Sequence, residues 1–320
     1  MSRKTKIWLW VAAALIGAGL LLFGITQGIT DGDYSKLTTV AYETNEYKLA
    51  GDFYNITINT DTAEVQLRRA EDGQCRVVCY EQQKVKHTVV ETSDTLSITV
   101  NDTRKWYEHI ILNFSKPKIT VYLPDGTYGA LRVETDTGAV QIGPDSSFES
   151  IDIFNHTGTV DNAASAAGNV HIRTTTGHIF AHSLSAKTLQ LSATTGQVSV
   201  WDAQIAGNVS IDISTGDVLV RNLQCQNLIS EGSTGNLGLE NVLATGKFDL
   251  ERDTGDVTLT DCDAAEIHIE TDTGDVSGNL LTPKIFDAHT DTGKVNVPQS
   301  TTGGICEIST DTGHIRITVS

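Results

Sequence analysis

The chain has 320 residues and carries 40 acidic against 23 basic side chains, a formal net charge of -17. A chain this acidic lacks the clustered Lys and Arg with which proteins bind phosphates, so we expect no nucleic-acid partner. Its 6% aromatic and 20% charged residues are typical neither of a disordered acidic tail nor of a compact aromatic-rich core.

The first thirty residues predict a membrane anchor. Arg3, Lys4 and Lys6 precede an uncharged stretch from Ile7 to Thr30, and a helix needs about 20 apolar residues to cross a bilayer. Because basic flanks stay in the cytoplasm, we expect residues 1–30 to form a cytoplasmic tip and a single-pass helix in the cell membrane, with the rest of the chain extracytoplasmic. The alternative is a cleaved signal peptide, which needs a shorter apolar core and a small-x-small cleavage site.

Residues 31–130 predict an irregular, membrane-proximal β unit. Apolar and polar residues alternate near residues 56–67, 96–100 and 119–123, and a period of two indicates half-buried strands. We expect this unit to cap the N-terminal end of the repeats that follow, because those repeats would otherwise expose unpaired strand edges.

A basic and aromatic patch lies within this unit. Its centre is Arg104, Lys105 and Trp106, with further lysines before and after it in the sequence. One interpretation is a set of solvated hairpin loops. The other is a contact with lipid headgroups or with a polymer of the cell envelope.

Residues 131–320 carry an internal repeat. A Thr-Gly pair recurs ten times, at intervals of 19 or 20 residues, and a fixed period of this length is the signature of a solenoid. The first pair is Thr137-Gly138, and the later glycines are Gly158, Gly177, Gly196, Gly216, Gly235, Gly255, Gly274, Gly293 and Gly313.

The apolar residues within each repeat predict a parallel β-helix. In most repeats they stand seven and five residues before the Gly and two residues after it, as Leu131, Val133 and Val140 do. The parity changes at the Gly, so the chain must bend or bulge there, with the Gly free to adopt positive φ. We expect the Thr before it to point inward as a ladder. Coils stacked about 4.8 Å apart make a rod of about 48 Å. A right-handed path is favoured, although short coils can be left-handed.

An acidic ladder accompanies the later corners. Stacked carboxylates repel one another, and calcium, which takes six to eight oxygen ligands, would relieve that repulsion. Asp is also a common turn residue, so solvated turns are the alternative to a cation site. The ladder consists of Asp253, Asp272, Asp291 and Asp311 two residues before the Gly, joined by Asp256 and Asp275 just after it.

The strand 118–124, which leads straight into residues 131–140, and the reiterated Thr-Gly-x-Val coils resemble the bacterial "putative adhesin" family. That family consists of membrane-anchored β-strand-repeat proteins whose domain has no assigned function. The resemblance covers residue 31 to the C-terminus. It implies display in the cell envelope and a role in adhesion or envelope-stress regulation, and it supplies no catalytic residues.

Signs of catalysis are few. The chain contains no Gly-x-Ser-x-Gly, His-Glu-x-x-His or Gly-x-Gly-x-x-Gly motif. A glycan-processing β-helix enzyme remains an alternative, but it needs paired carboxylates and usually an aromatic platform. The repeats contain one Trp and few Phe, and we expect the aromatic residues seven residues before or three residues after a corner Gly to be isolated or in the core. His178 and His314 share a position in the repeat but lie seven coils apart, and the nine histidines predict no cluster. We therefore expect a structural or interaction module with no cofactor, apart from the calcium considered above.

Two further expectations concern the cysteines and the C-terminus. The five cysteines lack both disulfide and metal-ligand spacing, which indicates small buried hydrophobes. The last strand, residues 315–319, has no evident cap, so we expect its open edge to dock an envelope partner or a second copy.

Overall fold

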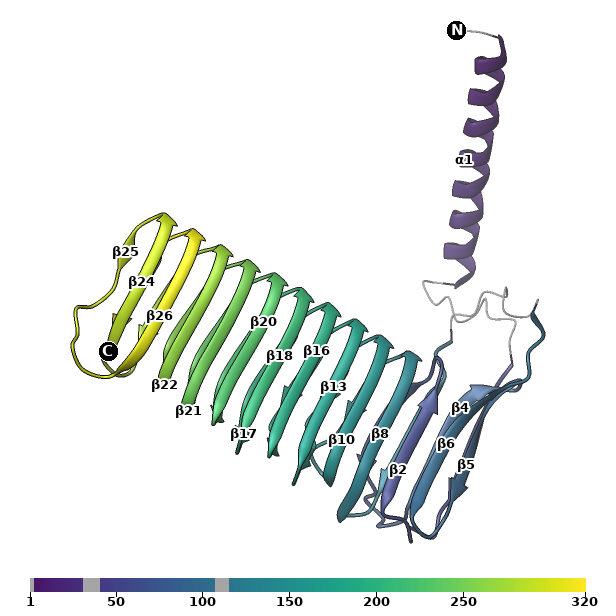
Figure 1. Ribbon diagram of the computed structural model, residues 1–320. Coiled ribbons are helices and arrows are strands. Elements are labelled where there is room, and N and C mark those ends of the chain that lie inside the picture. Colours follow the sequence, from purple (N-terminus) through teal and green to yellow (C-terminus); the bar gives the residue numbers. More distant parts are fainter. Residues whose placement is uncertain (1–2, 31–40, 107–114) are drawn as a thin grey trace.

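The computed structural model describes residues 3–30, 41–106 and 115–320 (Figure 1). Helix α1 (Arg3–Thr30) contains one segment, Thr5–Gly28, that is long and apolar enough to cross a membrane, and none of it is buried against the rest of the protein. The other regular elements of the described residues are β-strands. The predicted fold class, an all-β chain with one N-terminal apolar helix, is confirmed.

Seven strands precede the repeats. Strands β2 and β6 pair in parallel in one layer, and β3 and β7 pair in parallel in the other. Strands β2 and β3 also pair with the first coil, so the two layers continue the sheets of the solenoid. The antiparallel hairpin β4–β5 connects the layers, because β4 pairs with β7 and β5 with β6. The bounds are β1 (Tyr42–Lys48), β2 (Asn55–Thr60), β3 (Glu64–Arg69), β4 (Arg76–Gln82), β5 (Val85–Glu91), β6 (Thr95–Asp102) and β7 (Lys118–Leu123).

The repeats form a solenoid of ten coils in single file (Figure 1). Each coil has a strand on either side of its Thr-Gly corner, and β21 and β22 run on from one corner to the next. The strands before the corners are β8 (Thr127–Thr137), β10 (Ser147–Thr157), β13 (Asn169–Thr176), β16 (Thr188–Thr195), β18 (Asn208–Thr215), β20 (Asn227–Thr234), β21 (Leu237–Thr254), β22 (Val257–Thr273), β24 (Lys284–Thr292) and β26 (Gly304–Thr312). The remaining strands are β9 (Val140–Ile142), β11 (Val160–Asn162), β12 (Ser165–Ala166), β14 (Ile179–His182), β15 (Ser185–Ala186), β17 (Val198–Ile205), β19 (Val218–Cys225), β23 (Val276–Leu280), β25 (Val295–Asn296) and β27 (Ile315–Val319).

The core is one continuous column of inward side chains. Neighbouring coils pair in parallel with the repeat in register, so that Leu131 stacks on Ile151 and Ile151 on Val170. Two large rings, Phe148 and Phe248, are completely buried in this column. The predicted β-solenoid of about ten coils is therefore confirmed.

The prediction that the Thr next to each Gly points inward is wrong. Thr137 is exposed, and the buried position is two residues earlier, at Thr135. Two successive residues before the Gly point outward, so the alternation of inward and outward side chains is interrupted before the Gly and not at it. Side chains at the buried position take over the predicted role, since Asn155 Nδ2 donates to the Gly138 carbonyl at 2.8 Å and Thr310 Oγ1 to that of Gly274 at 3.1 Å.

The corner glycines are required by close backbone approach. A Cβ on Gly216 would lie 1.5 Å from the carbonyl oxygen of Gly196 on the neighbouring coil. The remaining nine corner glycines have the same restriction, with a neighbouring carbonyl oxygen at 2.6 Å or less. Gly216 also adopts a φ of 138°, which L side chains rarely do.

The last two coils stack in the reverse of their order in the sequence, so the prediction that the C-terminal strand forms the open edge is wrong. Strand β26 pairs with β22 on one side and with β24 on the other, and β27 lies between β23 and β25 (Figure 1). The chain skips one position after β23, and its final coil then fills the gap. Inserted there, Cys306 and Ile308 are fully buried, whereas Phe286 and Ala288 of β24 remain partly exposed. The open edge is thus β24, and not the C-terminal strand.

Candidate functional site

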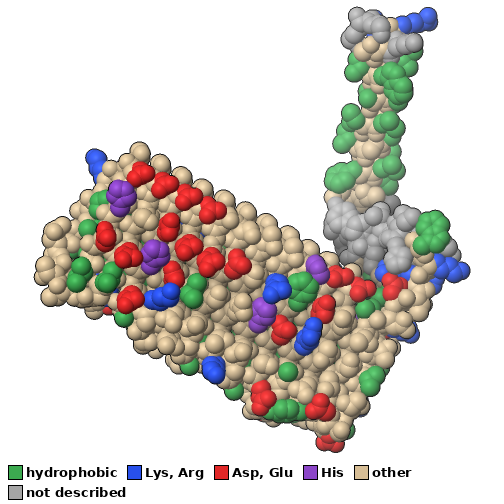
Figure 2. Space-filling model, viewed as in Figure 1, with side chains coloured by type: hydrophobic (Ala, Val, Ile, Leu, Met, Phe, Trp, Pro, Cys, Tyr) green, Lys and Arg blue, Asp and Glu red, His purple; other side chains and the backbone are tan. Residues whose placement is uncertain are grey.

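The four aspartates two residues before the Gly lie side by side. Because of the coil order, Asp311 stands between Asp272 and Asp291, with Asp253 beside Asp272. All four are exposed, and acidic side chains form rows over this half of the solenoid (Figure 2). We call these four residues the aspartate row.

The two aspartates after the Gly serve the turns. Asp256 Oδ1 accepts the backbone N–H of Asp275 at 2.8 Å, and Asp275 Oδ1 accepts that of His314 at 2.7 Å. Each uses one carboxylate oxygen to tie its coil to the next. Within the described residues, no group of three metal-ligating atoms lying within 4.8 Å of one another includes the predicted aspartates.

The basic and aromatic patch is partly neutralised by its own neighbours. Arg104 Nε donates to Asp102 Oδ1 at 3.0 Å, and this hydrogen bonding raises the pKa of the guanidinium. Lys105 is exposed and Trp106 is 79% exposed. The adjacent Tyr107 lies outside the described residues.

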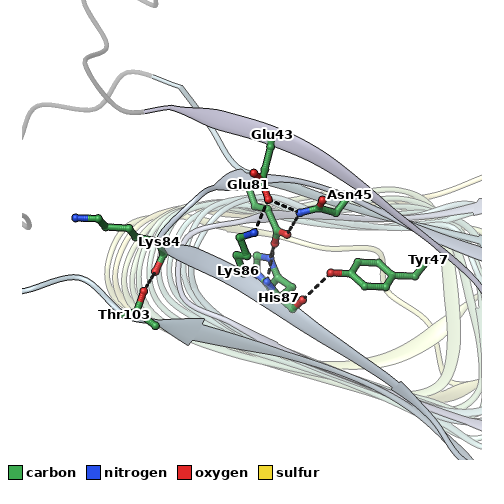
Figure 3. Close-up of polar contacts among 8 residues, drawn as sticks. All are labelled: Glu43, Asn45, Tyr47, Glu81, Lys84, Lys86, His87 and Thr103. Atoms are coloured by element: carbon green, nitrogen blue, oxygen red, sulfur yellow. Dashed lines mark hydrogen bonds and ion pairs between the residues drawn. The ribbon is translucent and has the colours of Figure 1, made fainter.

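A buried acid–imidazole pair lies in the N-terminal unit, where the sequence predicted no histidine cluster (Figure 3). Glu81 is 0% and His87 3% exposed, and His87 Nδ1 lies 2.7 Å from Glu81 Oε2. Glu81 also accepts the backbone N–H of His87 at 2.6 Å and Asn45 Nδ2 at 2.8 Å, while His87 Nε2 contacts Thr60 Oγ1 at 2.9 Å. The alternation of β4, which buries Val77, Cys79 and Glu81 on one face, is the sequence signal for this burial.

Cys79 completes a group of three possible metal ligands with this pair. Burial, and secondarily the charge of Glu81, raises the pKa of the Cys79 thiol to about 12. The thiol is therefore protonated at neutral pH, and both ring nitrogens of His87 already have partners. The group fits a hydrogen-bonded network that fixes the β4–β5 hairpin to β1 and β2 better than it fits a metal centre.

An aromatic stack lies on the outer face of the strands after the corners. His182 of β14 and Trp201 of β17 occupy the same position in successive coils, with parallel rings 4.4 Å apart. Phe180 lies 6.0 Å from Trp201, centroid to centroid. His182 Nε2 lies 2.9 Å from Asp161 on the preceding coil, and this contact orients the stack.

A groove of about 350 Å³ borders the opposite side of Trp201. Ser199 lies at its floor, between the larger Phe180 and Leu219 at the same position of the neighbouring coils. Ser199 is 6% exposed, so the floor of the groove is formed by a small side chain that lies almost entirely below the surface.

Charged and amide side chains form the rim of this groove. Arg221, on the coil after Trp201, is drawn away by an ion pair with Glu240 at 2.9 Å. Asn222 donates to Asp202 at 2.7 Å across the rim. A larger depression of about 580 Å³ elsewhere on the solenoid is lined mostly by Ala, Gln, Ser and Thr and has no aromatic wall. The Trp201 groove therefore combines an aromatic ring with polar side chains along its rim, as ligand sites do.

The sequence assigned no role to Trp201, and this stack was not predicted. The stack was detectable, because His182 and Trp201 both follow their corner Gly by five residues. The open groove beside it depends on the small side chain of Ser199 and on the direction that Arg221 takes, which the repeat pattern does not encode.

Comparison with known proteins supports the fold. A family model described as Toastrack DUF4097 matches residues 53–227 and 206–320. A "putative lipid binding protein" of Parabacteroides distasonis ATCC 8503 is 18% identical with a TM-score of 0.50, and the match covers 75% of this chain and 97% of that one. A "putative adhesin" of Parabacteroides merdae ATCC 43184 is 10% identical, also at 0.50, over 74% and 95% of the two chains. At these identities the likeness concerns the fold alone. No curated protein matches the chain.

Proposed function

The chain belongs to the Toastrack DUF4097 family, and from this premise we propose that it is a membrane-anchored envelope protein whose solenoid binds polysaccharide, without catalysis. The resemblance to "putative adhesin" proteins expected from the sequence is confirmed by this membership and by the solved structures. The observation that carries the proposal is the Trp201 groove. A flat aromatic face stacks on the C–H groups of a sugar ring, and convergent polar groups bind its hydroxyls.

The anchor is supported by α1 and by the basic residues at its N-terminal end. A helix this apolar, with no buried surface, is stabilised by lipid rather than by the rest of the protein. The three basic residues favour a cytoplasmic N-terminus, which places the solenoid outside the cytoplasm.

Cysteine labelling in intact cells tests this topology. The five native cysteines are buried, so a membrane-impermeant maleimide reports mainly on an introduced thiol. Thr137→Cys, at an exposed position of the first corner, is expected to react in intact cells, and Ser2→Cys only after lysis. The reverse pattern contradicts the orientation, and a protein shortened by the length of α1 indicates a cleaved signal peptide instead.

Binding of purified cell-wall polysaccharide to the full-length protein in liposomes tests the ligand class. Trp201→Ala is expected to weaken binding on the order of tenfold, because removing a stacked aromatic side chain costs about 1–3 kcal/mol with nucleobases, and we expect a similar loss with a sugar ring. Trp106→Ala, at an exposed tryptophan of the N-terminal unit, is the matched control and is expected to bind normally. Equal binding by wild type and Trp201→Ala contradicts the proposal, and loss with Trp106→Ala alone assigns binding to the basic patch.

A further inference from the structure

The distal end of the solenoid is uncapped. Strand β24 pairs with β26 on one side, and none of the described residues pairs with its other side. Its backbone therefore presents a nine-residue row of hydrogen-bonding groups, Lys284–Thr292. Solenoids need polar terminal repeats to stay soluble, and open edges pair with other strands.

Apolar side chains accompany this open edge. Phe286 and Ala288 occupy core positions but are covered on one side only. Val295 on β25, which occupies a core position as well, is 42% exposed, and Ile285 on the outer face is 43% exposed. The end of the solenoid thus exposes a cross-section of its own core.

We propose that a second copy of this chain covers this end, through antiparallel pairing of the two β24 strands about a two-fold axis at Ala288. The proposal is independent of the Trp201 groove and of its ligand.

The register follows from the sequence of β24. Residues directly opposite each other in an antiparallel pair point to the same face, so the axis must pass through a residue. Ala288 is the central residue of Lys284–Thr292, and only there do all nine residues of each strand pair.

Charge favours the same register. Centring on Ala288 sets Asp287 opposite His289 of the second copy, where the imidazole, which lies 3.0 Å from Asp291 of its own chain, offers its second ring nitrogen to the carboxylate. Two-fold symmetry makes this pair twice. With the axis at Asp287, the two copies of Asp287 face each other. With the axis at His289, Asp287 faces Asp291 of the second copy. Like charges directly opposite one another destabilise a strand pair.

The core also continues across the axis. Phe286, Ala288 and Thr290 of both copies lie on the inner face, so the two columns of core side chains join. Because the N-terminal unit lies at the other end of each solenoid (Figure 1), the joined rod carries its two N-terminal units at opposite ends. This arrangement suits contact between two membrane surfaces.

Sedimentation of the full-length protein in detergent over a range of concentrations tests the pairing. We expect a dimer for the wild type. His289→Asp sets two like charges opposite each other in two places and is expected to raise the dissociation constant on the order of tenfold, whereas His289→Lys sets a cation opposite each Asp287 and preserves or lowers it. Gln190→Asp and Gln190→Lys, at an exposed residue in the middle of the solenoid, control for net charge and are expected to change nothing.

Disulfide trapping tests the register. Ala288→Cys is expected to form a covalent dimer on mild oxidation, because residues opposite on the axis have Cβ atoms about 4.5–5.5 Å apart. Ile285→Cys is expected to form no covalent dimer, since six residues of strand, about 20 Å, separate the two introduced thiols. A monomer at every concentration, a mass that grows beyond the dimer, or a dimer trapped by Ile285→Cys and not by Ala288→Cys overturns the proposal.

Discussion

Substituting one corner glycine, Gly216→Ala, probes the contact that sets the coil spacing. Alanine at φ 138° pays about 1–3 kcal/mol of backbone strain. Its Cβ would lie 1.5 Å from the Gly196 carbonyl oxygen, so the two coils must separate, and overpacking of this kind costs about 1–3 kcal/mol more. The free energy of unfolding is expected to fall by about 2–6 kcal/mol, which lowers the Tm on the order of 10 °C.

Thermal unfolding of the full-length protein followed by circular dichroism measures this effect. Gly143→Ala is the matched control, because a Cβ there would meet no atom closer than 3.5 Å and its φ is not in the restricted range. Its Tm is expected to stay within about 2 °C of the wild type. A Gly216→Ala protein that melts with the control would refute the account of the corners as close-packed backbone columns.

Three further predictions concern charge and ionisation. Glu81→Ala leaves the buried backbone N–H and ring Nδ1 of His87 without their partner. Denaturant unfolding is expected to show a loss of about 2–6 kcal/mol in the free energy of unfolding, about 1–3 kcal/mol for each group, against about 0.5 kcal/mol for Asp249→Ala of an exposed ion pair; equal losses contradict the role of Glu81 as a buried hydrogen-bond partner. If the aspartate row binds calcium, millimolar calcium raises the Tm, and this rise disappears when the row is changed to Asn; the absence of any shift in the wild type would reject a cation site. Burial raises the pKa of the Cys225 thiol to about 12, above the value of about 8.5 in unfolded chains. The unfolded state therefore releases this proton first, and the free energy of unfolding falls as pH rises from about 9 toward 12, by up to about 1.4 kcal/mol per pH unit. Cys225→Ala is expected to reduce this slope, and an unchanged slope would contradict the burial of the thiol.

The solenoid was predictable because its determinants are local and repeated. Each corner needs a Gly, and each strand needs apolar residues at alternate positions, so one period of the sequence contains the information for all of them. The direction of the Thr was not predictable in the same way. Counting parity shows that the chain must bend between Val133 and Val140, but not which residue absorbs the change, and Thr135 rather than Thr137 turned out to be buried.

The order of the last coils depends on competition between distant segments. Both β24 and β26 fit the repeat, and both could pair with β22. The structure gives that place to β26, whose Cys306 and Ile308 become fully buried. No local pattern distinguishes the two coils. If the coils are assumed to stack in chain order, the C-terminal strand and not β24 is expected at the open edge.

The candidate sites differ in how far the sequence reveals them. Glu81 falls on the buried face of an alternating strand, and His182 shares its repeat position with Trp201, so both features lie within the pattern. The pairing of Glu81 with His87 and the opening beside Ser199 depend on side-chain directions, which only the folded chain defines.

Fluorescence of Trp201 during polysaccharide binding tests the central claim most directly. The chain has four tryptophans, of which two lie in α1, so Trp106→Phe leaves Trp201 as the only one outside the helix. Titrating this variant in liposomes with cell-wall polysaccharide is expected to give a saturable change in Trp201 emission with the same midpoint as the binding itself. Saturable binding that leaves the emission of Trp201 unchanged would contradict the groove as the site.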